Sequence, residues 1–248
     1  MHTYAWGTHP EMFGPRHEHR LARILAEVSK VRRGGRILDA ASGLGQLALR
    51  MQARGYRTFG IDASFDATLH VRRTTSIPVV LGDVTRLPFR DHAFDGVTSG
   101  ETLEHLDDDA GAAREIGRVL RDEGKAVITV PALRSLWSES DVYYEHRRRY
   151  SRAELTDLFR RAGLDVTKAS FWGFPVVLTY DTLFMLPMNK RRARRKVDSD
   201  APLQSVARAG RSRFLVNVVR AFFAVDRLFS FVPFGPGLLL VARKSAIR

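Results

Sequence analysis

The sequence predicts an α/β fold built on one mostly parallel β-sheet. Short apolar segments alternate with amphipathic helical patterns along most of the chain, and a turn of small residues directly follows the first apolar segment. The chain has 248 residues, which suits one sizeable domain with an added lobe. Strands that alternate with helices form right-handed βαβ units, and these units place the strands parallel within one sheet.

The apolar segments predict seven strands: Arg36–Ala40, Arg57–Asp62, Pro78–Leu81, Phe94–Ser99, Lys125–Val130, Asp165–Trp172 and Gly237–Arg243. Helical patterns cover residues 16–30, Gly45–Arg54, Ser64–Thr74, Ala110–Leu120 and Ala153–Ala162. We expect Ser151 and Glu154 to form a capping box at the start of the last helix, and Gly163 to end it.

These elements divide the chain into four segments. Residues 1–32 form an N-terminal helical segment, 33–172 the core, 173–236 a helical insertion, and 237–248 the last strand with a tail. A hairpin between the sixth and seventh strands would need only a few residues, so the insertion is a separate feature. It holds an apolar stretch, Pro175–Pro187, then a basic run and a helix from about 213 to 229.

Composition excludes several kinds of chemistry and location. The chain has no cysteine, which rules out disulfides, thiolate metal ligands and cysteine nucleophiles. The first residues lack a signal-peptide pattern, and no uncharged apolar run is long enough to span a bilayer. We therefore expect a cytoplasmic protein, with attachment to the inner face of the membrane as an alternative.

Positive charge is concentrated in the insertion. The net charge is +13, and residues 190–213 contain nine lysines and arginines against two aspartates, a local charge of 9 − 2 = +7. The other 224 residues therefore carry only 13 − 7 = +6. A basic run of this kind suits an anionic membrane, nucleic acid or an acidic substrate.

The strongest local motif is the turn from Asp39 to Gly45, which connects the first strand to the following helix. Its small residues allow close approach of a ligand to the backbone, and the start of the helix adds N–H donors. Nucleotide-like ligands use such turns.

Acidic residues follow the next two strands. Asp62 ends the second strand, 23 residues after Asp39, where a carboxylate can accept both ribose hydroxyls of an adenosine or cap a helix. Asp83 and Val84 follow the third strand and could contact adenine or form a polar turn. Since the carboxyl ends of parallel strands share one edge, a single extended ligand could touch all these residues.

Taken in order and spacing, LDAASGLG, GID, GDVTRLPF, FDGVTSGETLEHL and EGKAVITVP resemble the motifs of class I S-adenosylmethionine (SAM)-dependent methyltransferases. They are most similar to the type 11 small-molecule branch, which includes ubiquinone and menaquinone methyltransferases. The resemblance covers about residues 33–172, and it departs from the family at Ala41, where glycine is usual. It implies a Rossmann-like seven-stranded sheet in the order 3-2-1-4-5-7-6, strand 7 antiparallel, with helices on both faces.

The resemblance also implies SAM as the cofactor. The turn after the first strand would lie along the methionine moiety, Asp62 would hold the ribose, and Asp83 with Val84 the adenine. The residues expected at the cofactor are Asp39, Ala40, Ala41, Ser42, Gly43, Gly45, Asp62, Ala63, Asp83, Val84, Ser99, Gly100 and Glu101.

Candidate acceptor-side residues follow the fifth strand, where the family places substrate-facing groups. The expected substrate-binding residues are Trp137, Asp141, Tyr144, Arg148 and Tyr150. His146 is the candidate general base for a hydroxyl acceptor, and His105 has either an orienting or a structural role. We expect no metal, because Asp107–Asp109 has the pattern of a polar first helical turn.

The predicted function is methyl transfer to a small-molecule acceptor, with oxygen favoured over nitrogen and carbon. A natural-product, quinone-like or lipid-linked acceptor is expected. Residues 175–230 are predicted to act as a lid, as a homodimer contact, or as a peripheral contact with a membrane or a lipid-like substrate.

Three other functions compete with this prediction. The charge suggests an RNA methyltransferase, but SGETLEHL stands where base-amino methyltransferases carry an Asn/Asp-Pro-Pro-aromatic motif, so we do not expect nucleic acid as a partner. An NAD-dependent oxidoreductase would need a fuller Gly-x-Gly-x-x-Gly turn. A non-catalytic SAM-fold binding protein differs only in lacking turnover.

Overall fold

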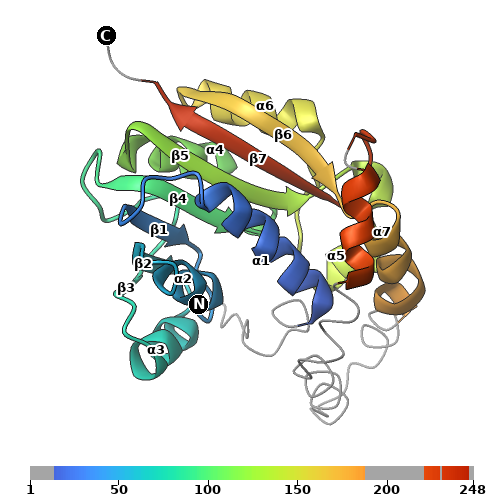
Figure 1. The fold of residues 1–248 in the computed structure, drawn as a ribbon, viewed down its shortest axis with the longest axis horizontal. Helices are drawn as coiled ribbons and strands as arrows, with labels where there is room; N and C mark the ends of the chain where they lie inside the picture. The colour runs from blue at the N-terminus through green and yellow to red at the C-terminus, as the bar shows by residue number, and fades with distance from the viewer. Residues whose placement is uncertain (1–13, 188–220, 230, 246–248) are drawn as a thin grey trace.

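The computed structural model describes residues 14–187, 221–229 and 231–245, and it shows a twisted sheet with helices on both faces (Figure 1). The strand order is β3-β2-β1-β4-β5-β7-β6, as the resemblance implied. The first five strands are parallel, while β7 runs antiparallel to β5 and β6. The strands are β1 (Arg36–Ala40), β2 (Arg57–Asp62), β3 (Val79–Leu81), β4 (Phe94–Gly100), β5 (Leu120–Pro131), β6 (Leu164–Trp172) and β7 (Gly237–Lys244).

All seven predicted strands are confirmed, and only β5 differs substantially in length. It begins at Leu120 rather than Lys125, and Leu120 pairs with Phe94 across a register shift in the β4–β5 ladder. The intervening residues, 121–124, are mostly charged. They lack the apolar pattern by which strands are recognised, so this part of the strand could not be predicted from the sequence.

One face of the sheet is covered by α1 (Pro15–Val28), α2 (Gln46–Gln52) and α3 (Phe65–Thr74). The predicted apolar face of α1 is confirmed, since Leu21, Ile24, Leu25 and Val28 are all buried in a cluster that reaches Val127 on β5. The N-terminal helix is therefore part of the layer that covers the sheet, and it crosses the molecule in front of β4 and β5 (Figure 1).

The opposite face is covered by α4 (Asp109–Val119) and α6 (Arg152–Arg161). Both helices contribute to the largest buried cluster, with Ile116 from α4 and Phe159 from α6. The predicted capping box is confirmed: Ser151 Oγ accepts a hydrogen bond from Glu154 N at 3.2 Å, and Glu154 Oε2 accepts one from Ser151 N at 2.8 Å.

The described parts of the insertion pack where β6 ends and β7 begins. They are α7 (Val176–Tyr180), the π-helix η5 (Asp181–Met185) and the 3₁₀-helix η6 (Ala224–Phe229). Asp226 of η6 accepts hydrogen bonds from the amides of Val176 and Val177 at 2.7 and 3.1 Å, so η6 holds the start of α7. Of the helix predicted at 213–229, residues 221–229 are helical and the rest lies outside the described residues.

Three short helices follow β4 and β5 at the carboxyl edge of the sheet. They are η3 (Leu103–His105), η4 (Arg134–Leu136) and α5 (Glu139–Tyr143). This edge also carries the turn after β1, so the candidate site lies here (Figure 1). Among the described residues, no helix is long and apolar enough to cross a membrane.

Candidate active site

The turn after β1 depends on left-handed backbone conformations. Ala41, Gly43 and Gly45 have φ angles of 63°, 52° and 74°. A Cβ atom on Gly45 would lie 3.1 Å from Cγ2 of Val71, so this position favours glycine for space as well as for φ. The turn therefore bends sharply into α2 and exposes its backbone at the sheet edge.

Asp62 holds this turn from the neighbouring strand. Its Oδ2 accepts a hydrogen bond from Gly43 N at 2.7 Å, and its Oδ1 accepts one from Ser64 N at 2.8 Å. Burial raises the pKa of the Asp62 carboxyl, although both backbone N–H groups oppose the shift. Ser64 is the N-cap of α3, so the alternative interpretation of Asp62 as that cap is wrong, and the ribose contact stays a prediction.

Asp39 lies beneath the turn and is 3% exposed. Thr98 Oγ1 donates a hydrogen bond to Asp39 Oδ1 at 2.9 Å. Burial raises the pKa of Asp39 to about 7; the charge of Asp62 adds to the rise, and the hydrogen bond from Thr98 opposes it. The site thus places two coupled carboxyl groups behind the glycine-rich turn.

A cavity of about 70 Å³, the turn cavity, opens between this turn and α1. It is lined from the sheet edge and α2 by Asp39, Ala41, Ser42, Gly43, Leu44, Gln46, Leu47 and Gly100, and from α1 by His17, Arg20, Leu21 and Ile24. Five predicted cofactor residues are therefore brought together. The contribution of α1 was missed, because an amphipathic pattern shows which face of a helix is buried but not which motif it meets.

Other predicted cofactor residues lie outside the lining of the turn cavity. Asp83 is exposed, and its Oδ1 accepts a hydrogen bond from Thr85 N at 2.8 Å, as a polar turn would. Val84 and Ser99 are buried, while Ala63 is exposed beside Asp62. Ala40 and Gly45 belong to the turn without lining the cavity. Their contacts with a cofactor stay predictions.

Glu101 links the end of β4 to α1. Its backbone is left-handed, with φ 58°, and its side chain is only 7% exposed. Glu101 Oε2 lies 3.5 Å from Arg20 Nη1 and 3.8 Å from Arg16 Nη1. Arg20 and Gly100, the neighbour of Glu101 in the chain, line the turn cavity, whereas Arg16 and Glu101 themselves do not.

A second cavity of about 110 Å³, the loop cavity, lies between the segment after β5, the insertion and α1. Its lining includes Arg16, Leu136, Asp141, Tyr144, His146, Arg149, Leu178, Asp181, Met185 and Leu186. The structure therefore brings the predicted residues Asp141, Tyr144 and His146 together. Trp137 is not among the lining residues and is 42% exposed.

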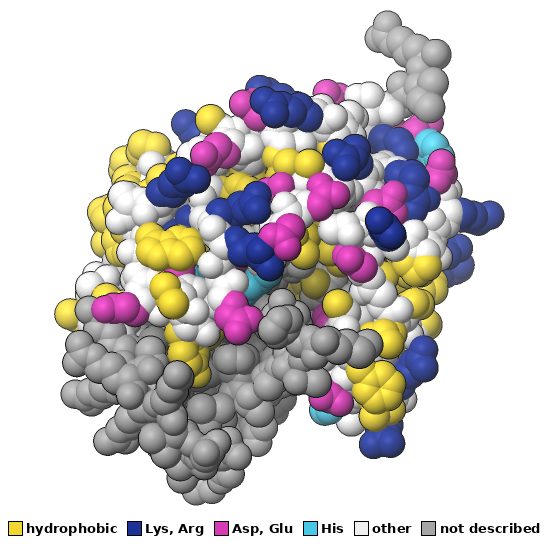
Figure 2. Space-filling view, turned by 180° about the vertical axis from the view of Figure 1, so that it is seen from behind, with side chains coloured by type: hydrophobic (Ala, Val, Ile, Leu, Met, Phe, Trp, Pro, Cys, Tyr) yellow, Lys and Arg dark blue, Asp and Glu magenta, His cyan; other side chains and the backbone are white. Residues whose placement is uncertain are grey.

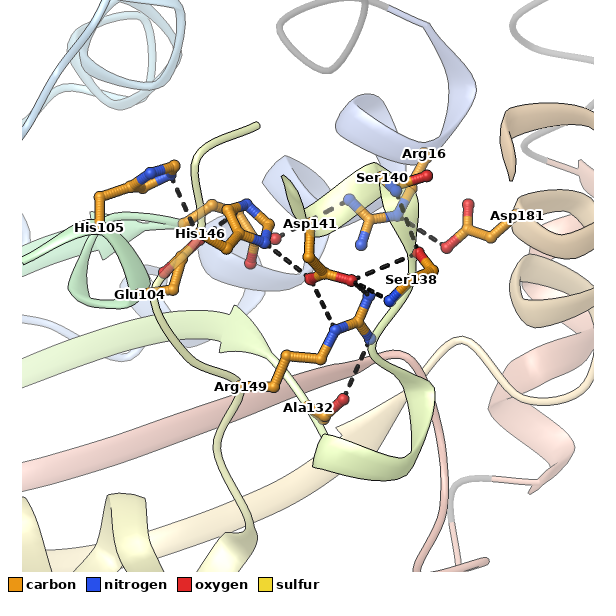
Figure 3. Close-up of polar contacts among 11 residues, drawn as sticks. Arg16, Glu104, His105, Ala132, Ser138, Ser140, Asp141, His146, Arg149 and Asp181 are labelled. Atoms are coloured by element: carbon orange, nitrogen blue, oxygen red, sulfur yellow. Dashed lines mark hydrogen bonds and ion pairs between the residues drawn. The ribbon is translucent and has the colours of Figure 1, made fainter. Parts of the chain in front are cut away.

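Asp141 organises one wall of the loop cavity (Figure 3). Its two carboxylate oxygens accept hydrogen bonds from Arg149 Nε and Nη2 at 2.7 and 2.9 Å, and its Oδ1 also accepts from His146 Nδ1 at 2.8 Å. Burial alone would raise the pKa of Asp141, but the hydrogen bonds from His146 and Arg149 outweigh it and hold the pKa at about 2. Asp141 is thus an ionised anchor for both side chains.

The two candidate histidines meet at a buried glutamate. The rings of His105 and His146 are 4.8 Å apart, and their Nε2 atoms lie 3.9 and 4.0 Å from Glu104 Oε1. The Glu104 side chain is fully buried. Burial lowers the pKa of His105 to about 4, helped by His146 and opposed by Glu101. Glu104 stands within the LEHL motif, but no role was predicted for it from the sequence.

Arg148 and Tyr150 contact protein groups rather than a cavity. Arg148 Nη1 donates to Asp109 Oδ2 at 2.9 Å, and the Tyr150 hydroxyl donates to the same oxygen at 2.7 Å. Tyr150 also lies 3.1 Å from the carbonyl oxygen of Leu103. These contacts fasten the segment after β5 to η3 and to the start of α4. A direct contact of either residue with substrate stays a prediction.

The comparisons with known proteins agree with this geometry. Residues 13–169 match the family model described as a methyltransferase domain. The chain is 36% identical over 95 residues to demethylmenaquinone methyltransferase of Mycobacterium sp. (strain KMS). The matched stretch covers 38% of this chain and 41% of that protein. It therefore spans less than half the length of this relative.

Solved structures share the fold. The methyltransferase in a complex with the Haloferax volcanii Trm112 methyltransferase activator has a TM-score of 0.61 at 24% identity, covering 93% of this chain and 91% of that one. Haemonchus contortus phosphoethanolamine N-methyltransferase 2, solved in complex with SAM, has a TM-score of 0.65 at 17% identity, covering 99% and 58%. With the family match, the strand order and the glycine-rich turn, the chain belongs to the methyltransferase-domain family of class I SAM-dependent methyltransferases.

Proposed function

We propose that this protein transfers the methyl group of SAM to a hydroxyl oxygen of a small apolar acceptor. The observation that carries the proposal is the pair of cavities on either side of the Glu101 ion pairs. Arg16 lines the loop cavity and Arg20 the turn cavity, one helical turn apart on α1, and both face Glu101. A cofactor in one cavity and an acceptor in the other would thus be near neighbours.

The turn cavity has the chemistry that SAM needs. Arg20 Nε is buried there without a hydrogen-bond partner among the described residues, and it suits a carboxylate. Asp39 lines the same cavity and Asp62 lies behind it, and these carboxyls suit an ammonium group and ribose hydroxyls. When bound, SAM supplies an electrophilic methyl group on a sulfonium, so the protein needs only to align and deprotonate the acceptor.

His146 is the group that would meet the acceptor. Because ionised Asp141 can only accept, His146 Nδ1 donates to it, and the neutral imidazole then carries a lone pair on Nε2. That atom can take the proton of a hydroxyl acceptor as its oxygen attacks the methyl carbon. His105 and Glu104 flank the same atom and would orient the acceptor.

The lining of the loop cavity favours an apolar acceptor with one polar end. Leu136, Leu178, Met185 and Leu186 line it together with Asp141 and His146. A quinol-like or isoprenoid-bearing phenol has this distribution. The insertion also exposes large apolar side chains, Leu183, Phe184, Phe222, Leu228 and Phe231, which supports a peripheral contact with a membrane or a lipid-like substrate.

The experiment is to incubate the protein with SAM and matched acceptors that carry either a phenolic hydroxyl or an amine on the same apolar frame. We expect S-adenosylhomocysteine to form with the phenols, and mass spectrometry to place the methyl group on oxygen. His146→Gln should lower kcat by about 100-fold or more, as expected for loss of a general base, while the exposed control His70→Gln keeps it.

Two results would replace this proposal. SAM binding without turnover across the panel would favour a non-catalytic SAM-binding protein. Methylation of RNA in preference to every small molecule would favour the nucleic-acid alternative.

A homodimer contact through the insertion is a separate question. It would appear as a concentration-dependent mass in sedimentation.

A further inference from the structure

Glu104, His105 and His146 form a compact group of metal-type ligands at the edge of the loop cavity (Figure 3). One ligand atom from each lies within 4.8 Å of the others, and the side chains are 0%, 11% and 5% exposed. The group joins two parts of the chain, η3 after β4 and the segment after β5, so it exists only in the folded protein.

The orientation of His146 makes this group suited to a cation. His146 Nδ1 bonds to Asp141 and Nε2 lies 4.0 Å from Glu104 Oε1, so in the neutral ring that donates Nδ1–H the lone pair of Nε2 is on the side of Glu104. Nε2 is buried without a hydrogen-bond partner among the described residues. Two acceptor atoms facing each other at this distance repel unless a positive charge lies between them.

His146 bonds through Nδ1 to the carboxylate of Asp141, and metal-bound histidines typically have a carboxylate partner of this kind. A ligating imidazole usually donates its other N–H to a carboxylate, which fixes the ring and increases the basicity of the ligand. Asp141 is such a carboxylate and is itself fixed by Arg149. Counted as ionised, Glu104 and Asp141 against Arg149 leave one net negative charge, which favours a cation.

The backbone around the ligands is fastened independently of their side chains. The amide of Arg147 donates to the carbonyl oxygen of Glu104 at 2.8 Å, and Arg147 Nε donates to that of His105 at 2.9 Å. These bonds tie η3 to the residue that follows His146. The three ligands are therefore held near one another before any ion binds, which lowers the cost of ordering them.

We propose that Glu104, His105 and His146 bind a divalent transition-metal cation of the Zn²⁺ class, with an open coordination position toward the loop cavity. Two imidazoles and one carboxylate are ligands that zinc and its neighbours prefer, and three protein ligands leave room for an exogenous oxygen. With metal–ligand bonds of about 2.1 Å, tetrahedral ligands lie about 3.4 Å apart. The two distances to Glu104 Oε1, 3.9 and 4.0 Å, need a contraction of about half an ångström, and the group as a whole, within 4.8 Å, needs up to about 1.4 Å.

The catalytic consequence rests on the proposed function, whereas cation binding does not. An acceptor hydroxyl at the open position would lose its proton to water more readily, because the cation stabilises the oxyanion. The oxygen–methyl bond would form as the methyl–sulfur bond breaks. In the metal-loaded protein His146 would be a ligand, and its role as the general base would apply only to the metal-free protein. The expectation of no metal, drawn from Asp107–Asp109, did not consider this group.

The test is titration of the chelator-treated 248-residue protein with Co²⁺ and Zn²⁺. Calorimetry should show one site, and Co²⁺ should give the visible absorption of a low-coordinate nitrogen–oxygen site. His105→Ala, His146→Ala and Glu104→Gln should each weaken binding by about 100-fold, since even changes behind the ligands cost about 10- to 100-fold. His92→Ala is the matched control, because His92 is an exposed histidine 3.4 Å from Asp122.

Binding of S-adenosylhomocysteine by each variant shows whether its fold persists. Absence of saturable Co²⁺ binding to the wild-type protein would overturn the proposal. So would equal affinity in the wild type and in folded His105→Ala and His146→Ala. If Co²⁺ binds as expected but methyl transfer is unchanged by chelation, the site stands and only its catalytic role is lost; if no acceptor is methylated, the proposed function fails while the site remains.

Discussion

The two sides of the candidate site are built in different ways. On the cofactor side, the backbone makes the site: three left-handed residues shape the turn after β1, and Asp62 holds it through two amide hydrogen bonds. On the acceptor side, side chains make it: Asp141, Arg149 and His146 form one bonded group, and Arg148 and Tyr150 reach Asp109 some 40 residues away. We therefore expect changes on the acceptor side to affect folding most, and changes on the cofactor side to affect ligand affinity.

Charged side chains are mixed over the face of the molecule that is turned away from the viewer in Figure 1. The back view in Figure 2 shows closely mixed acidic and basic side chains over much of the described surface. Exposed ion pairs such as that of Arg243 with Glu123 contribute little individually. Asp141 differs because it is fully buried, so loss of its ion pairs should lower the free energy of unfolding.

The largest expected effect follows from Asp141→Ala. The change would leave the Arg149 guanidinium, whose side chain is only 12% exposed, without its carboxylate, and it would also remove an acceptor for the amide of Ser138. Loss of one partner of a buried pair typically costs about 3–5 kcal/mol, so urea denaturation should show a fall of that order in the free energy of unfolding. The exposed control Asp157→Ala on α6 should change it by less than about 0.5 kcal/mol.

A loss below about 1 kcal/mol for Asp141→Ala would contradict the comparison. It would mean that the acceptor side is held by the backbone as well, through bonds such as that between the amide of Leu133 and the carbonyl oxygen of Tyr150.

The pH dependence of stability tests the cofactor side. The pKa of Asp39 is raised by burial to about 7 in the folded protein, against about 4 in the unfolded chain. Between these values the folded state binds the extra proton, so stability from this group is greatest near pH 4 and falls as pH rises to about 7. The loss should be at most about 4 kcal/mol, and Asp39→Asn should remove it from urea denaturation curves recorded between pH 5 and 8. A variant with the unchanged pH slope of the wild type would show that another group titrates there.

The contrast also explains how far the sequence could predict the structure. The strands, their order and the turn at Asp39–Gly45 are local patterns, in which apolar period and small residues determine the backbone directly. Lining residues Ala41, Ser42 and Gly43 were therefore found. Asp83 followed the same pattern but points into its own turn, because a short carboxylate after a strand can bond the nearest amide instead of a ligand.

The acceptor side could not be predicted to the same depth. Arg147, Arg148 and Tyr150 stand in one short motif, yet each finds its partner on the segment from Leu103 to Asp109, and nothing local in the sequence encodes that pairing. The position of Arg16 at the loop cavity could not be predicted either, since nothing in the sequence distinguishes it from the other charged residues of an amphipathic helix. A signal did exist for Glu104: an acidic residue flanked by leucines and followed by histidine is unusual in a buried segment.

Asp62→Ala should weaken SAM binding on the cofactor side while leaving the fold intact. The change removes the acceptor for Gly43 N and the predicted partner of the ribose, and lost charged hydrogen bonds of this kind cost about 1–3 kcal/mol. Calorimetry should therefore show an increase in Kd of about 5- to 150-fold. Asp66→Ala, an exposed residue in the first turn of α3, is the control. Unchanged affinity in Asp62→Ala would separate Asp62 from the cofactor and leave it a purely structural role.

The smallest expected effect concerns Ala41, a non-glycine residue with a left-handed φ of 63°. A left-handed conformation costs an L-residue about 1–2 kcal/mol, and glycine avoids this strain but loses about 0.5–1 kcal/mol more entropy on folding. Ala41→Gly should therefore stabilise the protein by about 0.5–1 kcal/mol in urea denaturation. Gly45→Ala should do the opposite, because it adds the same strain and places a methyl group 3.1 Å from Val71. If Ala41→Gly instead destabilised the protein, the turn would depend on the methyl group of Ala41, and the cofactor side would share the side-chain construction of the acceptor side.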